Sequence, residues 1–128
     1  MLLEPEIVLL VDDDAAVRSA LKFALEVEGF RVQLYVSSAA LLADDRLPQR
    51  GCLVIDYRMP GIDGLELMDR LRARQVTLPA ILISGQVNQD LCGRATRLGV
   101  AHVLEKPLSD MTLVESIRLV LAPSGLAG

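Results

Sequence analysis

The chain has 128 residues, 52% of them hydrophobic, which fits one globular domain and leaves no room for a second. Its net charge of -4 offers no basic stripe for a phosphate backbone, so direct nucleic-acid binding is not expected. There is no apolar run near the roughly 20 residues of a membrane span and no secretion signal, which predicts a cytoplasmic protein. Cys52 and Cys92 lack metal-site spacing and are expected to be small hydrophobic residues.

The first half of the chain alternates between apolar runs and helical stripes. Residues 7–11 are continuously apolar, as in a strand covered on both faces. A stripe at helical spacing follows and stops at Gly29, a natural end for a helix. Residues 31–36 alternate polar and apolar side chains, which predicts an edge strand. The serine pair that follows is suited to cap a short helix through residue 43.

The second half continues the alternation with three more strands, each followed by a helix. The predicted strands cover residues 53–55, 80–83 and 101–104, and the predicted helices cover about residues 65–71, 88–98 and 110–121. Right-handed crossovers leave few arrangements for such a pattern, so we expect a (βα)5 doubly wound parallel sheet with helices on both faces. Residues 123–128 begin with a helix-breaking proline and are predicted to be a flexible tail or the start of a linker.

Charged residues stand directly after three of the predicted strands. Asp12, Asp13 and Asp14 follow the first strand, Asp56 follows the third, and Lys106 follows the fifth after one intervening residue. The carboxyl ends of parallel strands meet at one crevice, so these side chains are expected to converge there. Clustered carboxylates with an ammonium group point to a hard cation and a phosphoryl group.

Four short motifs occur in register along the chain. They are Val-Asp-Asp-Asp at 11–14, Ile-Asp-Tyr-Arg-Met-Pro-Gly-Ile-Asp-Gly at 55–64, Ile-Ser-Gly at 83–85 and Glu-Lys-Pro at 105–107. On these motifs, roughly residues 5–122 resemble the receiver domain of bacterial two-component response regulators. The resemblance implies a CheY-like, flavodoxin-like fold with strand order 2-1-3-4-5, in which the alternating second strand lies at an edge.

The resemblance also implies the chemistry of the site. Asp56 would accept a phosphoryl group from the phosphohistidine of a sensor histidine kinase or phosphotransfer protein. Asp13 would bind Mg²⁺ directly and Asp12 directly or through water, with Asp56 and the backbone carbonyl of Arg58 completing the protein ligands. Such a domain is a signalling phosphoacceptor, not a classical enzyme, although it assists its own phosphorylation and dephosphorylation.

Further motif residues take roles from the same resemblance. Lys106 would pair with the phosphoryl oxygens, and Ser84 would donate its hydroxyl to one of them. The bond between Lys106 and Pro107 is expected to be cis. Arg58 and Gln86 occupy positions that tune hydrolysis of the aspartyl phosphate in the family.

The chain departs from the family where the phosphorylated state is usually sensed. Val103 and Leu108 stand where aromatic residues are common, so the usual aromatic switch is in doubt and another element must carry a conformational change. The helix predicted at 88–98 contains Gly93 and is expected to be marginal, with the least protected amides of all the helices. His102 is expected to be a surface residue.

The sequence also leaves two alternative functions open. The chain could be a degenerate receiver that serves only as a docking or dimerisation module. Less favoured is a phosphatase of the haloacid-dehalogenase type, with Asp12 as nucleophile and Asp14 as general acid. A receiver is expected to control an output domain, here one for transcription regulation, and to have the option of forming a homodimer through its fourth helix, fifth strand and fifth helix.

Overall fold

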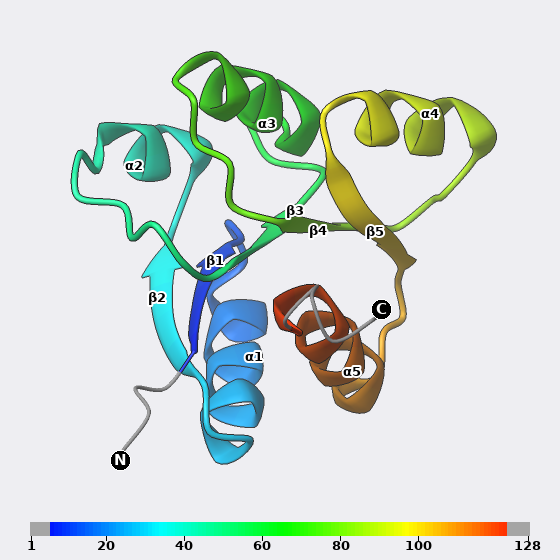
Figure 1. Cartoon of the computed structure of the whole chain (residues 1–128). Helices are drawn as coiled ribbons and strands as arrows, with labels where there is room; N and C mark the ends of the chain where they lie inside the picture. The colour runs from blue at the N-terminus through cyan, green and yellow to red at the C-terminus, as the bar shows by residue number, and fades with distance from the viewer. Residues whose placement is uncertain (1–5, 123–128) are drawn as a thin grey trace.

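The computed structural model describes residues 6–122, which fold into a five-stranded parallel sheet between two layers of helices (Figure 1). The strands are β1 (Ile7–Val11), β2 (Arg31–Tyr35), β3 (Cys52–Asp56), β4 (Ala80–Ser84) and β5 (Val100–Glu105). The helices are α1 (Ala15–Val27), α2 (Ser38–Ala43), α3 (Gly64–Ala73), α4 (Gln89–Arg97) and α5 (Asp110–Leu121). The strand order β2-β1-β3-β4-β5 confirms the predicted fold, whereas the predicted tail at 123–128 lies outside the described residues.

The position of each strand follows from its side chains. The inner strands β3 and β4 are buried along their whole length, and β1 is buried from Val8 to Val11. The edge strand β2 is only partly covered, and its Leu34 is exposed. Partial cover is typical of an edge strand, and it agrees with the alternation of polar and apolar residues in the sequence of β2.

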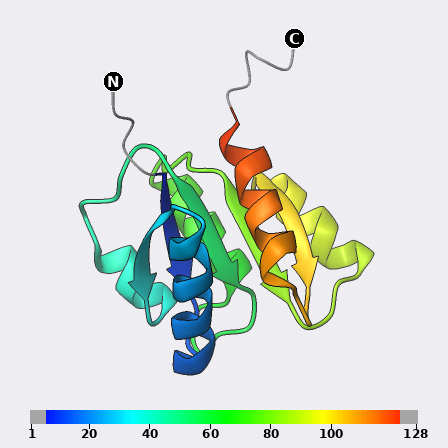
Figure 2. The same ribbon diagram turned by 90° about the horizontal axis from the view of Figure 1, so that it is seen from below.

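Two hydrophobic clusters fill the space between the sheet and its helices. Successive strand residues point to opposite faces, so Leu9 and Leu53 pack under α2, α3 and α4, whereas Leu10 and Val54 pack under α1 and α5. Figures 1 and 2 show the same division, with α1 and α5 together on one side of the sheet. Both faces are therefore covered, and the edge formed by the carboxyl ends of the strands is left for a site.

Every helix begins with a side chain that caps its N-terminus. The capping residues are Asp14, Ser37, Asp63, Asn88 and Ser109, and each accepts at least one backbone N–H of the first turn. Such caps satisfy amides that have no partner within the helix. The prediction for the serine pair is confirmed, with Ser37 as the cap of α2.

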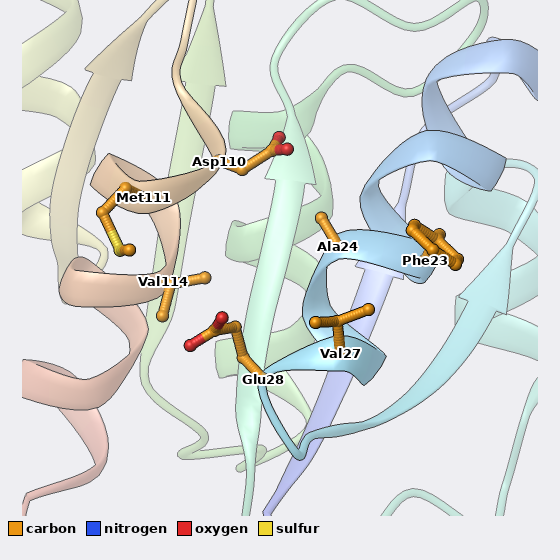
Figure 3. A pocket seen from close by; sticks show the side chains of 7 residues that line it. All are labelled: Phe23, Ala24, Val27, Glu28, Asp110, Met111 and Val114. Carbon is orange, nitrogen blue, oxygen red and sulfur yellow. The ribbon is translucent and has the colours of Figure 1, made fainter.

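A shallow apolar groove of about 250 Å³ lies between α1 and α5. Figure 3 shows Ala24 and Val114 between the two helices, with Phe23 on the outer side of α1. The groove ends at Glu28, whose carboxylate pairs with Arg118 of α5 at 3.0 Å. The two helices are thus tied to each other at the end of α1, while part of their apolar surface stays open.

Arg72 of α3 ties two turns together at the opposite end of the sheet from the strand carboxyl ends. Its guanidinium donates hydrogen bonds of 2.8 Å to the carbonyls of Val76 and Leu78, before β4, and bonds of 2.9 and 3.2 Å to those of Leu98 and Gly99, before β5. The C-terminal end of α4 is therefore fastened to α3.

No helix between residues 6 and 122 is long and apolar enough to cross a membrane. The cytoplasmic location stays a prediction.

Candidate phosphoryl-transfer and metal site

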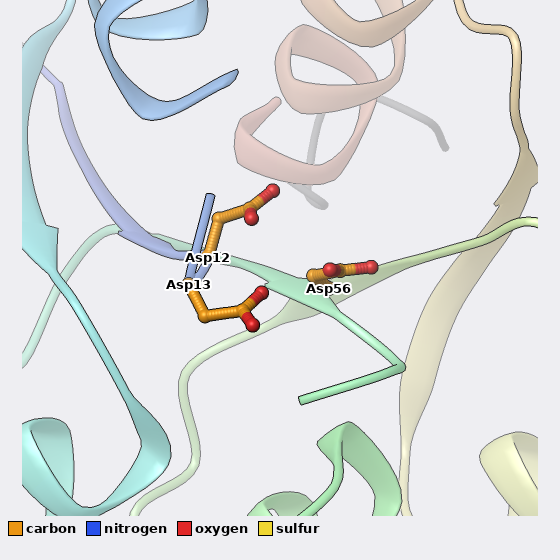
Figure 4. A group of neighbouring side chains, drawn as sticks. All are labelled: Asp12, Asp13 and Asp56. Atoms are coloured by element: carbon orange, nitrogen blue, oxygen red, sulfur yellow. The ribbon is translucent and has the colours of Figure 1, made fainter. Parts of the chain in front are cut away.

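The three predicted acidic residues meet at the carboxyl end of the sheet. Val11 and Ile55 are register partners in the neighbouring strands β1 and β3, so the residues that follow them emerge side by side. One carboxylate oxygen from each of Asp12, Asp13 and Asp56 lies within 4.8 Å of the other two (Figure 4). Three carboxylate oxygens at this spacing are a donor set that suits a hard divalent cation. The residues therefore fit the metal that the sequence predicts.

Asp12 is the most enclosed member of the cluster. Its side chain is buried, and its carboxylate accepts the backbone N–H of Asp14 at 2.9 Å. Burial raises the pKa of Asp12, the Asp14 N–H counteracts this, and the charge of Asp56 raises the pKa further. Asp13 is exposed and reaches the same point from the solvent side. A cation placed among these groups would relieve their mutual repulsion.

Asp56 is buried at the end of β3 and is paired with the predicted lysine. The Nζ of Lys106 lies 3.2 Å from Oδ1 of Asp56. Burial raises the pKa of Asp56, whereas the charge and hydrogen bond of Lys106 lower it. The Asp56 carboxylate thus lies between the ammonium group of Lys106 and the carboxylates of Asp12 and Asp13.

Lys106 reaches this position because the end of β5 is fixed to the end of β4. Its backbone N–H donates a hydrogen bond of 2.9 Å to the carbonyl of Ser84. The bond between Lys106 and Pro107 is cis, as predicted. A cavity of about 210 Å³ lies beside the lysine, between Val17 and Leu21 of α1 and Leu108 after β5.

The hydroxyl of Ser84 is engaged within its own turn. It donates a hydrogen bond of 2.7 Å to the carbonyl of Gln86 and accepts the N–H of the same residue at 3.2 Å. The side chain is buried at the end of β4, next to the strand that carries Asp56. Ser84 thus lies on the correct strand, but its hydroxyl is occupied and must turn before it could meet a phosphoryl oxygen.

Two glycines shape the loop after Asp56 for different reasons. Gly61 has a φ of +78°, which a turn glycine adopts readily. Gly64 begins α3, and a Cβ there would lie 2.9 Å from the carbonyl oxygen of Asp56 and 2.8 Å from Cδ1 of Leu82. Position 64 therefore needs glycine because α3 packs closely on the end of β3.

The departures from the family pattern also have clear places in the fold. Val103 is half-buried and packs against the cluster under α2, α3 and α4. Leu108 packs on the opposite face of the sheet. His102 is half-exposed on β5. No aromatic side chain therefore occupies the place of the usual switch residue.

Two residues at the acid cluster, Asp14 and Arg18, make contacts that were not among the sequence-based predictions. Asp14 accepts the N–H groups of Ala16 and Val17 as the cap of α1, and this role weighs against a phosphatase with Asp14 as general acid. Arg18 donates a hydrogen bond of 2.8 Å to the carbonyl of Asp12. An aspartate directly before a helix is a recognisable capping signal. The sequence carries no comparable signal for the contact of Arg18, because that contact depends on how α1 lies beside β1.

This sheet, with its acid cluster and lysine, defines a receiver-type domain, and comparison with known proteins gives the same result. The model of the response regulator receiver domain family matches residues 8–118, and the chain belongs to that family. It is 43% identical over 119 residues to the transcriptional regulatory protein FixJ of Azorhizobium caulinodans, covering 92% of this chain and 56% of that protein. It is 39% identical over 114 residues to the C4-dicarboxylate transport transcriptional regulatory protein DctD of Pseudomonas aeruginosa, covering 89% of this chain and 25% of that protein.

Solved structures share the whole fold. A crystal structure of FixJ-N has a TM-score of 0.83 at 33% identity, with 92% of this chain and 94% of that chain covered. The chemotaxis protein CheY4 of Vibrio cholerae has a TM-score of 0.85 at 22% identity, covering 91% and 99% of the two chains, and shows likeness of fold alone. The chain spans about half the length of the FixJ proteins that it matches.

Proposed function

We propose that Asp56 is the phosphoacceptor of this receiver domain. The observation that carries the proposal is the pairing of a buried carboxylate with Lys106 at 3.2 Å, in the same crevice as Asp12 and Asp13. A lone acid after a strand would need neither partner. Two acids and a lysine around one carboxylate suit a centre that transfers a phosphoryl group and must offset its negative charge.

The transfer is a nucleophilic displacement at phosphorus. An oxygen of the Asp56 carboxylate forms a bond to the phosphorus of a phosphohistidine, and the bond from phosphorus to the imidazole nitrogen breaks, with its electron pair leaving on the nitrogen. Lys106 neutralises charge on the phosphoryl oxygens as the group arrives. The product is an aspartyl phosphate on this chain and a free histidine on the partner.

Mg²⁺ would be held by Asp12, Asp13 and Asp56, with the backbone carbonyl of Arg58 as a further ligand. When bound, it supplies positive charge that screens the carboxylates and the transferred group. Asp12 contributes a buried oxygen that is already oriented by the Asp14 N–H, whereas Asp13 contributes an exposed one. This difference in burial suits a site that a small ion enters from solvent.

Ser84 is the group that would report phosphorylation to the rest of the domain. Its hydroxyl would exchange the carbonyl of Gln86 for a phosphoryl oxygen, and this exchange would release the turn between β4 and α4. Val103 has no ring to follow that movement, so the change would pass through this turn and α4. The hydrolysis rate of the phosphate would depend on Arg58 and Gln86, which flank the acceptor and the serine.

The partners belong to the same proposal. The named relatives are transcriptional regulatory proteins, and this chain corresponds to only part of their length. We therefore expect a sensor histidine kinase or phosphotransfer protein as donor and an output domain for transcription regulation beyond the receiver. Homodimer formation through α4, β5 and α5 is proposed as one route by which phosphorylation controls that output.

The decisive experiment is intact mass spectrometry after incubation with acetyl phosphate, with and without Mg²⁺. The wild type should gain one phosphoryl group in a Mg²⁺-dependent way, and Asp56→Asn should gain none. Asp69→Asn, which removes an exposed acid from α3, serves as the matched control and should react like the wild type. If the wild type gains no adduct while a known receiver does under the same conditions, the chain is a docking or dimerisation module and not a phosphoacceptor.

A further inference from the structure

Arg18 lies beside the acid cluster but donates its hydrogen bond to a backbone carbonyl. It lies in the first turn of α1, and side chains of a helix point back toward its N-terminus, which brings the guanidinium to the end of β1. There its Nη1 donates 2.8 Å to the carbonyl of Asp12, and among residues 6–122 it forms no ion pair with a carboxylate. The side chain is half-buried. Arg18 therefore holds the main chain at this point and does not neutralise one particular acid.

The carbonyl that Arg18 holds is part of the link between two acids of the cluster. Because a peptide unit is planar, the orientation of the Asp12 carbonyl also sets the direction in which Asp13 leaves the strand. Asp12 is fixed at two other points, since its N–H donates to the carbonyl of Tyr35 at 3.3 Å and its carboxylate accepts the Asp14 N–H. Arg18 supplies the remaining contact, and it is the only one of the three that orients the peptide leading to Asp13.

We infer that Arg18 is a positioning residue that preorganises the acid cluster for a divalent cation by fixing the peptide plane between Asp12 and Asp13. Without the hydrogen bond, this peptide must be ordered when the cation binds, and the cost of ordering appears as weaker affinity. The identity of the cation as Mg²⁺ rests on the proposed function. The inference that Arg18 orients the peptide between Asp12 and Asp13 does not depend on the proposed function.

The test compares two methionine variants of α1. Arg18→Met keeps a long apolar stem and removes every donor. Lys22→Met removes the same charge one turn later, from a side chain that pairs with Glu26 at the surface. In calorimetric titrations of the whole chain with MgCl₂ at constant ionic strength, Arg18→Met should raise the Kd about tenfold, the size expected when a group supporting a ligand is lost. Lys22→Met should stay within about twofold of the wild type, because besides the charge it removes only an exposed pair with Glu26.

A second measurement needs no metal. Amide hydrogen exchange at Asp14, whose N–H is bound to the Asp12 carboxylate, should be about tenfold faster in metal-free Arg18→Met than in Lys22→Met. Should methionine impair folding, Arg18→Gln, which is too short to bridge to the carbonyl, repeats both measurements with the same expectation.

The outcomes separate the two proposals. An equal Kd in Arg18→Met and Lys22→Met would overturn the inference, since charge alone would then account for any loss. If the wild type and Asp13→Asn bind Mg²⁺ equally well, the metal assignment in the proposed function fails. The role of Arg18 is then decided by the exchange rates in metal-free protein, and unchanged exchange at Asp14 would overturn it.

Discussion

The hydroxyl of Tyr35, at the end of β2, controls the ionisation of a neighbouring acid. It donates a hydrogen bond of 2.6 Å to Oδ2 of Asp44, the residue that ends α2. This bond is the main reason why the pKa of Asp44 is lowered, and the backbone N–H of Arg46 adds to it. Burial, followed by the same bond, raises the pKa of Tyr35. The raised pKa keeps the tyrosine neutral and able to donate this bond at neutral pH.

Replacing this tyrosine should make stability depend differently on pH. A carboxyl whose pKa is lower in the folded state stabilises the protein above its unfolded pKa, ordinarily 3.8, and the stabilisation is lost as the pH falls through the folded value. We expect Tyr35→Phe to unfold at lower urea concentration than the wild type at neutral pH, with a difference that narrows below about pH 4. An NMR titration of the Asp44 carboxyl carbon should show a higher pKa in the variant.

Tyr57→Phe provides the control, because the Tyr57 hydroxyl has no side-chain or backbone hydrogen bond among residues 6–122. A stability difference for Tyr35→Phe that stays constant from neutral pH to pH 3 would contradict the prediction.

At the scale of elements, α4 is supported by less packing than α3 and α5. It has nine residues, of which only Leu91 and Ala95 are buried, and it carries Gly93 in its interior. A Cβ at Gly93 would meet no heavy atom within 4 Å, so the glycine answers no demand of packing. Gly93 therefore lowers the stability of the helix, and no close packing requires a glycine there.

Hydrogen exchange and one substitution test this weakness. In the wild type, the amides of α4 should exchange faster than those of α3 and α5, which bury more side chains. Gly93→Ala should slow that exchange and raise the free energy of unfolding by about 0.5–1 kcal/mol, since alanine is the better helix former.

The matched substitution at the start of α3 should act in the opposite direction. Gly64→Ala would place a Cβ against the Asp56 carbonyl and Leu82, and we expect a loss of about 1–3 kcal/mol. Equal protection of α4 and α3 in the wild type would show that burial does not rank the helices here.

The sequence predicted well the features that depend on the spacing of apolar residues and on the chemistry of neighbouring side chains. The apolar runs of β1 and β3, the alternation of β2 and the stop at Gly29 follow from side chains a few residues apart. The convergence of Asp56 and Lys106 also followed, because parallel strands end at one edge. Contacts that depend on how one element lies against another could not be predicted in this way. The bond of Arg18 and the close approach at Gly64 are of this kind.

At the scale of the whole molecule, the acid cluster lowers the stability of the metal-free fold. Burial is the main cause that raises the pKa of both Asp12 and Asp56, and the charge of Asp13 raises both further. An acid whose pKa is raised by folding contributes stability below its unfolded pKa, and this is lost as the pH rises through the folded value. Near neutral pH the ionised cluster therefore favours unfolding, a common cost of a site built for function.

Asp13→Asn should show how much the acid cluster lowers the free energy of unfolding and how far bound Mg²⁺ restores it. Without metal at neutral pH, we expect the variant to be more stable than the wild type by about 0.5–2 kcal/mol, because one of three repelling charges is gone. With Mg²⁺ at ten times its Kd, the wild type should gain about 1.4 kcal/mol by linkage and the variant much less. Urea unfolding with and without MgCl₂ measures both effects, with Asp69→Asn as the surface control. An equal gain from Mg²⁺ in Asp13→Asn and wild type would contradict the role of Asp13.

The four carbonyls held by Arg72 limit how α4 can move. Its C-terminal end is fastened to α3 through Leu98 and Gly99, whereas its N-terminal cap, Asn88, follows the turn that contains Ser84 and Gln86. The helix is about 13 Å long, so a rotation of 10° about the fastened end would carry Asn88 through roughly 2 Å and leave Arg97 almost in place. In such a rotation the contacts of Arg72 would mark the pivot. The displacement of α4 would be largest at its N-terminal end, which follows the turn that contains Ser84.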